Sequence, residues 1–599
     1  MAGNNYPGPP AGPVEYYFPF EQKGPEANTF EIALVLGGTG SAGTYTAGVL
    51  DFLIEALDAW ARAKQEDDKA RPTVPPHRVV LRVITGTSGG GVNAILAGRA
   101  LNFSYPPASM TADEATRAKN PFFDLWVNSI DVEGLLATTD LNGATIPSLV
   151  CGNALDAAAK KGLDFTGGPP PYRDYLVNPL PLTVTLTNLA GIPYKMDFTG
   201  ASGRSEYFID HADFMRLAVE FTRVVKPPPY LIPPDALAVT PATMPGDWSN
   251  LQQYALGTAA FPAGFPPRKI SRSAENYRYR YYTWVDEPQT ATARDGFNYQ
   301  QAGEAHSDWL TPDWSCVIPP DADATSYKFF ALDGGCTDNE PVELARTWLA
   351  GLHARNPRDG INANRAVILV DPFAEQPPAA KTPGPNPGLL ALLFPIVDTL
   401  VQANRYATAD LSLFVNPNVY SRYLVTPNRP DPDAANRVGP ALAGGDAITG
   451  ARLGAFMGFM SKDFRAHDFM LGRRNCQAFL KWWFTVPANN KVFGTPKPKP
   501  VPRTDGRPAN LELPIIPLYG SAALEQPLPD WPAGKFDPQS ISDAIKNRLD
   551  AMLKVAESEL PINAFKRWLL SFANRPAEDF IVNYAINAID KELKREPKL

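Results

Sequence analysis

The chain has 599 residues, of which 44% are hydrophobic, and this is enough apolar material for a large packed core. It carries 56 Lys and Arg against 63 Asp and Glu, with no basic stripe, so its charge argues against a nucleic-acid partner and against attraction to anionic lipid. Only four cysteines occur, without a CxxC pair, which argues against a disulfide scaffold or a zinc site and favours a reducing compartment.

The first part of the chain, residues 1–28, is rich in glycine, proline and aromatic residues and is predicted to form an irregular arm. It has neither the basic start nor the apolar stretch of a secretory signal. Elsewhere, no apolar run reaches the ~20 residues that a membrane span needs. We therefore expect a cytoplasmic protein, and any transient contact with a membrane surface would rest on apolar side chains.

Between residues 29 and 375 the pattern predicts an α/β domain. A short apolar run at residues 32–36 ends at glycines, which is typical of a buried parallel strand, and a second strand is expected at residues 79–84, again ending in a glycine-rich turn. Each run is followed by apolar residues at helical spacing, and strand–helix–strand–helix order favours a mostly parallel sheet. Further elements are expected as strands at residues 182–187, 327–332 and 366–370 and as a helix at residues 341–353.

Residues 376–599 are predicted to form a largely helical extension that packs on this domain. A Pro/Gly-rich stretch opens it, and apolar residues then recur at helical spacing. The helical segments are expected at residues 389–407, 450–461, 476–484, 541–560, 562–573 and 581–593.

The first motif with chemical meaning is Gly86-Thr87-Ser88-Gly89-Gly90, a GxSxG between a predicted strand and a predicted helix. A nucleophile elbow needs this context, because the sharp turn exposes the serine hydroxyl and the helix dipole favours developing negative charge. Gly86 and Gly90 would avoid clashes between strand and helix. A loop serine in a glycine-rich turn is the plainer interpretation, but the strand–turn–helix context favours Ser88 as a nucleophile.

The second motif is the glycine turn from Gly38 to Gly43, directly after the first predicted strand. Backbone amides in such a turn form an anion-binding concavity. One functional interpretation is a dinucleotide fingerprint, and the other is an oxyanion hole for a tetrahedral acyl intermediate. A dinucleotide site wants an acidic residue at the end of the second strand, where this chain has the GxSxG serine instead, so the oxyanion hole is favoured over it. A purely structural turn remains the third alternative.

The third motif is Asp333-Gly334-Gly335, at the end of an apolar run. Alone it is an ordinary turn. In a parallel sheet, however, the carboxyl ends of the strands face one edge, and this would bring Asp333, Ser88 and the glycine turn to one rim.

The order GxGxxG, GxSxG and DGG resembles the patatin-like phospholipase family, over roughly residues 31–373. The flanking residues are similar too, with Ala-Leu-Val-Leu before the glycine turn and Asn-Glu-Pro after the DGG. The long C-terminal extension points to a bacterial-type subgroup. The resemblance implies a three-layer α/β/α sandwich with a mostly parallel central sheet.

The resemblance also implies the chemistry of a serine lipid acyl hydrolase. Ser88 would be the nucleophile, Asp333 would accept its proton directly, and the amides of Gly38, Thr39 and Gly40 would form the oxyanion hole. The other motif glycines are Gly43, Gly86, Gly90, Gly334 and Gly335. Substrates would be acyl esters of phospholipids, lysophospholipids or neutral lipids, with no metal, no cofactor and no nucleic acid.

Two positions of the glycine turn depart from the family pattern. Many members carry Arg or Lys where this chain has Ala42, and glycine where it has Thr39. The first departure puts a phospholipid preference in doubt and leaves a neutral or non-phospholipid ester open. Two further alternatives also stay open, namely acyl transfer on the same site and a lipid-binding module on a hydrolase fold.

Three other features have weaker claims to a role. None of the five histidines is expected in the chemistry, because the Ser–Asp pair needs none. Arg473 and Arg474 are consistent either with an anion clamp or, more plainly, with ion pairs at a helix surface. Residues 388–401 are crowded with apolar side chains, which indicates either a buried helix or a lid at the acyl-chain entrance.

Overall fold

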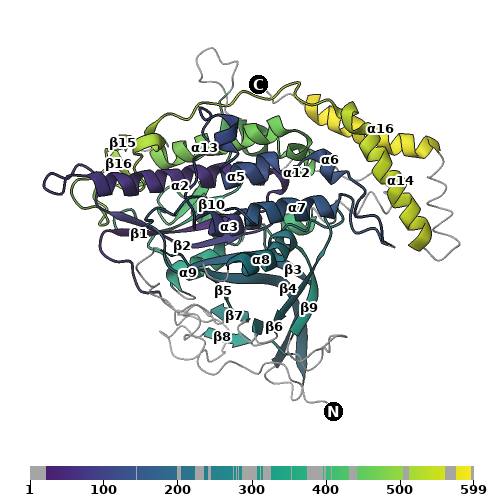
Figure 1. Ribbon diagram of the computed structural model, residues 1–599. Helices are drawn as coiled ribbons and strands as arrows, with labels where there is room; N and C mark the ends of the chain where they lie inside the picture. Colours follow the sequence, from purple (N-terminus) through teal and green to yellow (C-terminus); the bar gives the residue numbers. More distant parts are fainter. Residues whose placement is uncertain are drawn as a thin grey trace.

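A nine-stranded sheet forms the centre of the protein (Figure 1). The computed structural model describes residues 22–594 with gaps at residues 144, 198–203, 223–234, 241–243, 274–275, 278–279, 281, 286–306, 311, 314–325, 352–353, 374–395, 397–398, 406–407, 431–441, 503–510 and 560–574. Along the sheet the strands follow the order β11-β10-β1-β2-β3-β4-β5, and β9 pairs with both β3 and β6. Their bounds are β1 Thr29–Leu36, β2 Arg78–Gly86, β3 Leu180–Asp197, β4 Ser205–Val219, β5 Leu237–Val239, β6 Arg268–Ser273, β9 Ser326–Asp333, β10 Arg365–Val370 and β11 Arg422–Val425.

The strands β11, β10, β1, β2 and β3 run parallel to one another, and alternate residues of β1 supply two separate cores. Ile32 and Leu34 belong to the larger core, which includes α2 and α3. Ala33 and Val35 belong to the core beneath α9. A strand buried on both faces needs apolar residues at every position, which explains its unbroken apolar run.

Helices cover both faces of the sheet, as a three-layer sandwich requires (Figure 1). The larger helices are α2 Gly43–Glu66, α3 Gly89–Ala100, α7 Gly152–Leu163, α8 Met244–Thr258, α9 Val342–Ala350, α11 Thr408–Val415, α13 Lys462–Trp482, α14 Ser542–Glu559 and α16 Arg575–Lys594. The short ones are α4 Glu114–Arg117, α5 Pro121–Phe123, α6 Val132–Leu135 and α12 Arg452–Ala455. These observations, with the helical C-terminal part, confirm the expected fold class.

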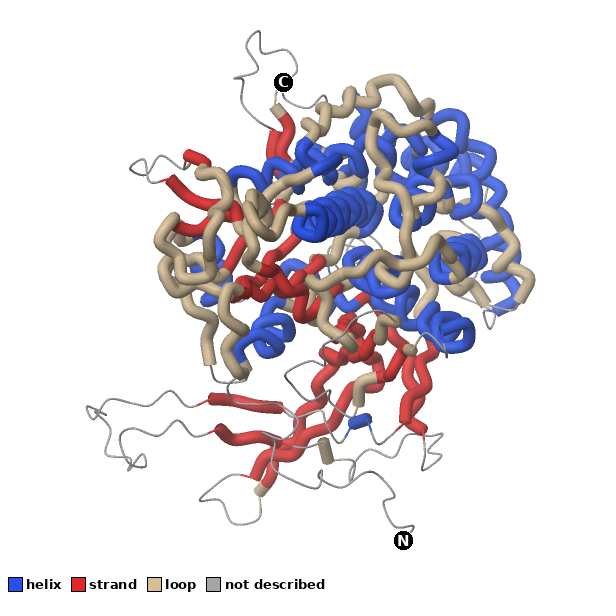
Figure 2. The backbone as a smooth tube through the Cα atoms, turned by 60° about the vertical axis from the view of Figure 1, so that its left-hand side comes forward, coloured by secondary structure: helices blue, strands red, loops and turns tan. Residues whose placement is uncertain are grey.

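Strand β3 is much longer than predicted, and its length explains how β9 enters the sheet. Beyond Val184, where β2 has ended, β3 continues to pair with β4 on one side. Strand β9 takes the vacated side, antiparallel to β3, with Asp333 opposite Leu186. The expectation that Asp333 ends a parallel strand is therefore wrong, although the edge that it reaches is the expected one. Figure 2 shows these long strands leaving the helical body.

The C-terminal part of the chain packs closely on the α/β core. Strand β11 extends the parallel sheet beside β10, and α13 lies alongside α2 (Figure 1). Any Cβ at Gly48 of α2 would collide with the backbone of Phe469, so only a glycine permits this approach. Arg473 of α13 then reaches Asp51 and Glu55 of α2 in a buried ion-pair cluster.

The C-terminal part also contains structure that the sequence did not indicate. A small antiparallel sheet joins β14 Thr485–Pro487, β15 Val501–Pro502 and β16 Leu511–Pro514. Helix α13 starts at Lys462, well before the predicted residue 476, and α16 starts at Arg575, before the predicted residue 581, whereas α14 agrees with prediction. The predicted helix at residues 450–461 is wrong, because the only α-helix in this described segment is the short α12, whose backbone is non-helical at Leu453 and Gly454. Of the other predictions, the helix at residues 562–573 and most of the apolar segment 388–401 lie outside the described residues. Within the described ranges, no helix has both the length and the apolar character of a membrane span.

Candidate active site

Ser88 lies at a sharp turn between β2 and α3. Its backbone has φ 53° and ψ −128°, a conformation that is uncommon for a residue with a side chain and costs about 1–3 kcal/mol. The turn is tight because strand and helix nearly touch: a Cβ at Gly86 would come within 2.6 Å of the Gly90 carbonyl oxygen, and one at Gly90 would collide with Leu36. The Ser88 amide donates to Thr258 Oγ1 at 3.0 Å. This arrangement has the geometry of a nucleophile elbow.

Asp333 makes direct contact with this serine. Ser88 Oγ donates to Asp333 Oδ2 at 2.7 Å, and both residues are buried, with 7% and 4% of their surfaces exposed. The other carboxylate oxygen, Oδ1, accepts the Gly335 amide at 2.8 Å. The Asp333 backbone is held at both ends, since its amide donates to the Ala260 carbonyl and its carbonyl accepts the Thr187 hydroxyl. The carboxylate is thus fixed in position to receive the serine proton.

Burial controls the proton affinity of Asp333. Desolvation raises its pKa to about 6, and the hydrogen bonds from Ser88 and the Gly335 amide oppose this rise. At neutral pH the group is ionised yet much more basic than an exposed aspartate. This combination suits a general base that works without a histidine.

The glycine turn lies next to the elbow and is anchored at its start. The Gly37 amide donates to the Val370 carbonyl and the Gly38 amide to the Asn339 carbonyl, both at 3.1 Å. The Gly38 amide is therefore already hydrogen-bonded and helps to hold the turn in place. At Gly40 the backbone has φ +51°, where glycine is favoured.

Thr39, at the position where many relatives have glycine, points its side chain into the protein. Its Oγ1 is buried and has no hydrogen-bond partner among the described residues. It lies against Gly89, because a Cβ placed there would collide with it. Thr39 therefore fills the space between the glycine turn and the start of α3.

An apolar cavity opens beside Ser88. Its volume is about 660 Å³, including the part open to solvent, and Gly40, Ser88, Gly89 and Arg268 are among the residues that line it. The rest of the wall comes from segments far apart in the sequence, among them Trp126, Leu155 of α7, Ala255 of α8, Phe265 and Phe459. Sequence reasoning missed these residues because no local pattern marks them. Such a mostly apolar cavity with few polar groups is typical of a site for an apolar ligand.

A buried charged network supports the site from behind. Arg405 contacts Glu340 at 3.0 Å and Asp371 at 2.8 Å, and Asn339 donates to Glu340 at 2.7 Å. Burial and the nearby Asp371 raise the pKa of Glu340 to about 7, while Arg405 opposes the rise. Because the Asn339 carbonyl holds Gly38, this network fixes the start of the glycine turn. The Asn-Glu-Pro flank after the DGG was its only signal in the sequence.

The histidines within the described ranges bind elsewhere. His77 contacts the Ile515 carbonyl at 2.8 Å, and burial lowers its pKa to about 4. His211 contacts the Asn188 carbonyl at 2.7 Å, and His467 contacts Asp468 and Arg429. None of these four contacts involves Ser88 or Asp333. His306 and His353 lie outside the described residues.

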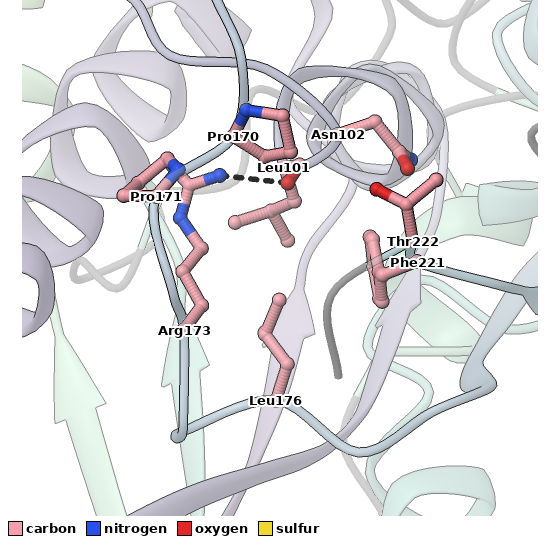
Figure 3. Close-up of a pocket in the computed structure, with 8 residues that line it drawn as sticks. All are labelled: Leu101, Asn102, Pro170, Pro171, Arg173, Leu176, Phe221 and Thr222. Atoms are coloured by element: carbon pink, nitrogen blue, oxygen red, sulfur yellow. Dashed lines mark hydrogen bonds between the residues drawn. The ribbon is translucent and has the colours of Figure 1, made fainter. Parts of the chain in front are cut away.

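Two other features of the described chain belong to the packing. A smaller hollow of about 240 Å³ lies around Leu101, Pro171 and Arg173. The Arg173 guanidinium donates to the Leu101 carbonyl (Figure 3) and forms an ion pair with Asp58. Arg473 forms the ion pairs with α2 described above, so the plainer prediction of ion pairs holds, but they are buried between two helices and not at a helix surface. Across the described residues, no cluster of three His, Cys, Asp or Glu side chains could hold a metal ion.

Comparison with known proteins agrees with this geometry. The model of the family described as "Patatin-like phospholipase" matches residues 34–346, a segment that contains Ser88, Asp333 and the glycine turn. The chain is also 30% identical over 612 residues to the uncharacterized protein y4iI of Sinorhizobium fredii (strain NBRC 101917 / NGR234), which covers 94% of this chain and 81% of that protein. The similarity to y4iI thus extends over most of the C-terminal part, and the family match supports lipid acyl hydrolysis as the general activity. The chain belongs to the patatin-like phospholipase family.

Proposed function

We propose that the protein is a serine lipid acyl hydrolase of the phospholipase A, lysophospholipase or esterase type, with Ser88 as nucleophile and Asp333 as general base. The observation that carries this proposal is the 2.7 Å hydrogen bond between the two side chains at the edge of an apolar cavity. A serine hydroxyl is a weak nucleophile until a neighbouring base removes its proton. Here that base is in contact with the hydroxyl before any substrate binds.

The reaction proceeds in two halves. Ser88 Oγ attacks the ester carbonyl carbon while its proton passes to Asp333, and the carbonyl oxygen becomes an oxyanion. The C–O bond of the leaving alcohol then breaks, Asp333 returns the proton to that alcohol, and an acyl-serine remains. In the second half water attacks the acyl-serine, Asp333 accepts the water proton and passes it to Ser88 Oγ, and the fatty acid is released.

The oxyanion is assigned to the amides of Thr39 and Gly40. Gly40 lines the cavity next to Ser88, while the Gly38 amide already donates to Asn339. Gly38 therefore has a supporting role, in which it holds the turn so that the two following amides face the carbonyl oxygen of the ester. Fixed amide donors of this kind stabilise the charge that develops in the transition state.

The cavity supports an ester whose acyl part is an unfunctionalised chain. Its walls carry Trp126, Leu155, Phe265 and Phe459, which offer dispersion contacts and few hydrogen bonds. A hydrocarbon chain gains about 0.8 kcal/mol for each CH₂ that it buries there. Arg268 also lines the cavity, but it is paired with Asp156 at 2.8 Å, and Ala42 carries no charge, so the proposal extends to neutral esters as well as phospholipids.

A substrate panel tests this function. Purified protein is incubated with phosphatidylcholine, lysophosphatidylcholine, a triacylglycerol and p-nitrophenyl esters, and the products are identified by mass spectrometry, with Ser88→Ala as control. We expect release of free fatty acid from at least one of them by the wild type alone. Adding a lysolipid acceptor distinguishes acyl transfer, which would give a diacyl product. No turnover of any ester would favour a lipid-binding module instead.

A further inference from the structure

A segment of the C-terminal part, residues 449–459, lies across the glycine turn, and we name it the strap. Both of its ends are held by α13. Asp468 accepts the amides of Thr449 and Gly450 at 2.9 and 2.7 Å. Arg465 donates to the carbonyl oxygens of Gly458 and Phe459 at 3.1 and 3.0 Å. Asp468 and Arg465 are three residues apart on the helix and both are buried, so α13 presents the strap as a fixed loop.

The strap meets the glycine turn at Ser41, which is fully buried. Its hydroxyl donates to the Gly450 carbonyl and accepts the Gly458 amide, each at 3.0 Å, across more than 400 residues of sequence. One hydroxyl therefore ties both limbs of the strap to the turn. The fit is close, because a Cβ at Gly458 would come within 2.7 Å of Ser41 Oγ.

The residues on either side of Ser41 are confined by the same strap. A Cβ at Gly40 would come within 2.7 Å of the Ala455 carbonyl oxygen, and one at Gly450 would come within 3.1 Å of the Ala42 backbone. The backbone of the strap turns sharply to make these contacts, with φ 52° at Leu453 and φ 69° at Ala455. Ala42 is thus packed against the strap.

We propose that Ser41 is a positioning residue for the oxyanion amides and that the C-terminal part completes the active site through it. The inference rests on the proposed function, since it concerns the same Thr39 and Gly40 amides. Ser41 does not touch substrate. It holds the end of the glycine turn against the strap, as Asn339 holds the start of the turn at Gly38. The Thr39 and Gly40 amides thereby keep their direction while the oxyanion charge develops. A displacement of about 1 Å at such donors is enough to slow the reaction by roughly a hundredfold.

The test is Ser41→Ala, with Ser461→Ala as the matched control. Ser461 lies two residues after the strap. Its hydroxyl accepts the Asp463 amide at the start of α13 and not a group of the glycine turn. We measure kcat and KM on a p-nitrophenyl ester, the inhibition constant of a trifluoromethyl ketone, and the melting temperature. The ketone forms a tetrahedral adduct with a serine nucleophile, whose charged oxygen occupies the oxyanion position.

For Ser41→Ala we expect kcat to fall by roughly tenfold to a hundredfold, KM to change by less than about threefold, and ketone affinity to fall together with kcat. Ser461→Ala should keep wild-type kcat and ketone affinity even if its melting temperature falls. Unchanged kcat in folded Ser41→Ala, or lost kcat with unchanged ketone affinity, would overturn the inference.

Gly458→Ala provides a second variant if Ser41→Ala does not fold, because its new Cβ pushes against Ser41 from the strap side. It should lower kcat and ketone affinity together, and wild-type values in the folded variant would overturn the inference. Ser88→Ala separates the two proposals. If it abolishes turnover while Ser41→Ala is fully active, only the positioning role fails, and if it retains turnover, the proposed function itself fails.

Discussion

Ser88 Oγ lies 2.7 Å from Asp333 Oδ2, although the two residues arrive on strands that run in opposite directions. Ser88 follows the end of β2 by two residues, and the β2 residue Gly86 pairs with Val184 of β3. Asp333 pairs with Leu186, two residues further along β3. The pairing of both β2 and β9 with the long strand β3 therefore brings the two side chains to the same edge of the sheet.

The first prediction concerns the pH dependence of turnover. Asp333 acts as a base only when it is ionised, and its pKa in the folded protein is raised to about 6. We expect kcat/KM to rise about tenfold per pH unit below this value and to level off above it. The measurement is hydrolysis of a soluble short-chain ester between pH 4 and pH 9. A profile that stays flat down to pH 4.5 would exclude Asp333 as the base.

The second prediction concerns the variant Asp333→Asn, which keeps the shape of the side chain but removes its charge. Loss of the base should lower kcat by a factor on the order of 10³ or more. The free energy of unfolding of Asp333→Asn, in contrast, should be higher than that of the wild type at neutral pH. The raised pKa means that the folded state binds the proton more tightly than the unfolded state, so the free energy of unfolding falls as pH rises from about 4 to 6.

An asparagine does not ionise, so Asp333→Asn avoids this fall in the free energy of unfolding. In the wild type the fall is on the order of 3 kcal/mol above pH 6. The melting temperature of Asp333→Asn should exceed that of the wild type at pH 8, and the difference should shrink as the pH approaches 4. Thermal unfolding at both pH values measures this. A lower melting temperature for Asp333→Asn at pH 8 would show that the carboxylate stabilises the fold and is not held at a cost.

The third prediction is that histidine takes no part in the chemistry. His77, His211 and His467 are hydrogen-bonded to groups other than Ser88 and Asp333. Each single His→Ala variant, those of His306 and His353 included, should keep at least about a tenth of wild-type kcat, a cost below ~1.4 kcal/mol. Activity is measured per folded molecule, because His77 and His467 are buried. A thousandfold loss in any folded variant would indicate a triad.

The fourth prediction concerns acyl-chain length. Phe459 lines the cavity and packs near Phe265, with their ring centroids 6.3 Å apart. Phe459→Ala should enlarge the cavity and move the preference among p-nitrophenyl esters towards longer chains, whereas Phe459→Trp should move it towards shorter ones. Phe464→Ala is the control, because this buried phenylalanine belongs to a separate core. A chain-length profile that is the same in all three variants would remove Phe459 from the acyl site.

The sequence predicts those parts of this fold whose signal is local. Strands β1 and β2 are mostly apolar because helices cover both faces of the sheet, and the glycines after them mark turns that only a small residue permits. For helix α13 (Lys462–Trp482), the sequence predicts only the last third, from residue 476 onward. Its buried face carries Arg465, His467 and Asp468, so the apolar periodicity that identifies a helix is interrupted. Arg465 and Asp468 are the two of these that anchor the strap.

The candidate site likewise has some residues that a local sequence pattern marks and others that no local pattern marks. Motif order identifies Ser88, Asp333 and the glycine turn, because each residue sits in a short pattern with its own backbone requirement. The cavity walls and the strap come from segments hundreds of residues apart, and nothing in the local sequence of Phe459 or Gly458 indicates a role. The direction of β9 was also missed, since a short apolar run does not reveal how its strand pairs.

The most direct test of the account is covalent labelling of the nucleophile. The protein is treated with a fluorophosphonate probe, digested, and mapped by mass spectrometry, alongside Ser88→Ala assayed on a p-nitrophenyl ester. The account predicts one labelled peptide, modified at Ser88, no labelling of the variant, and a loss of turnover on the order of 10³ or more. Labelling at another serine, or near-normal hydrolysis by folded Ser88→Ala, would contradict it.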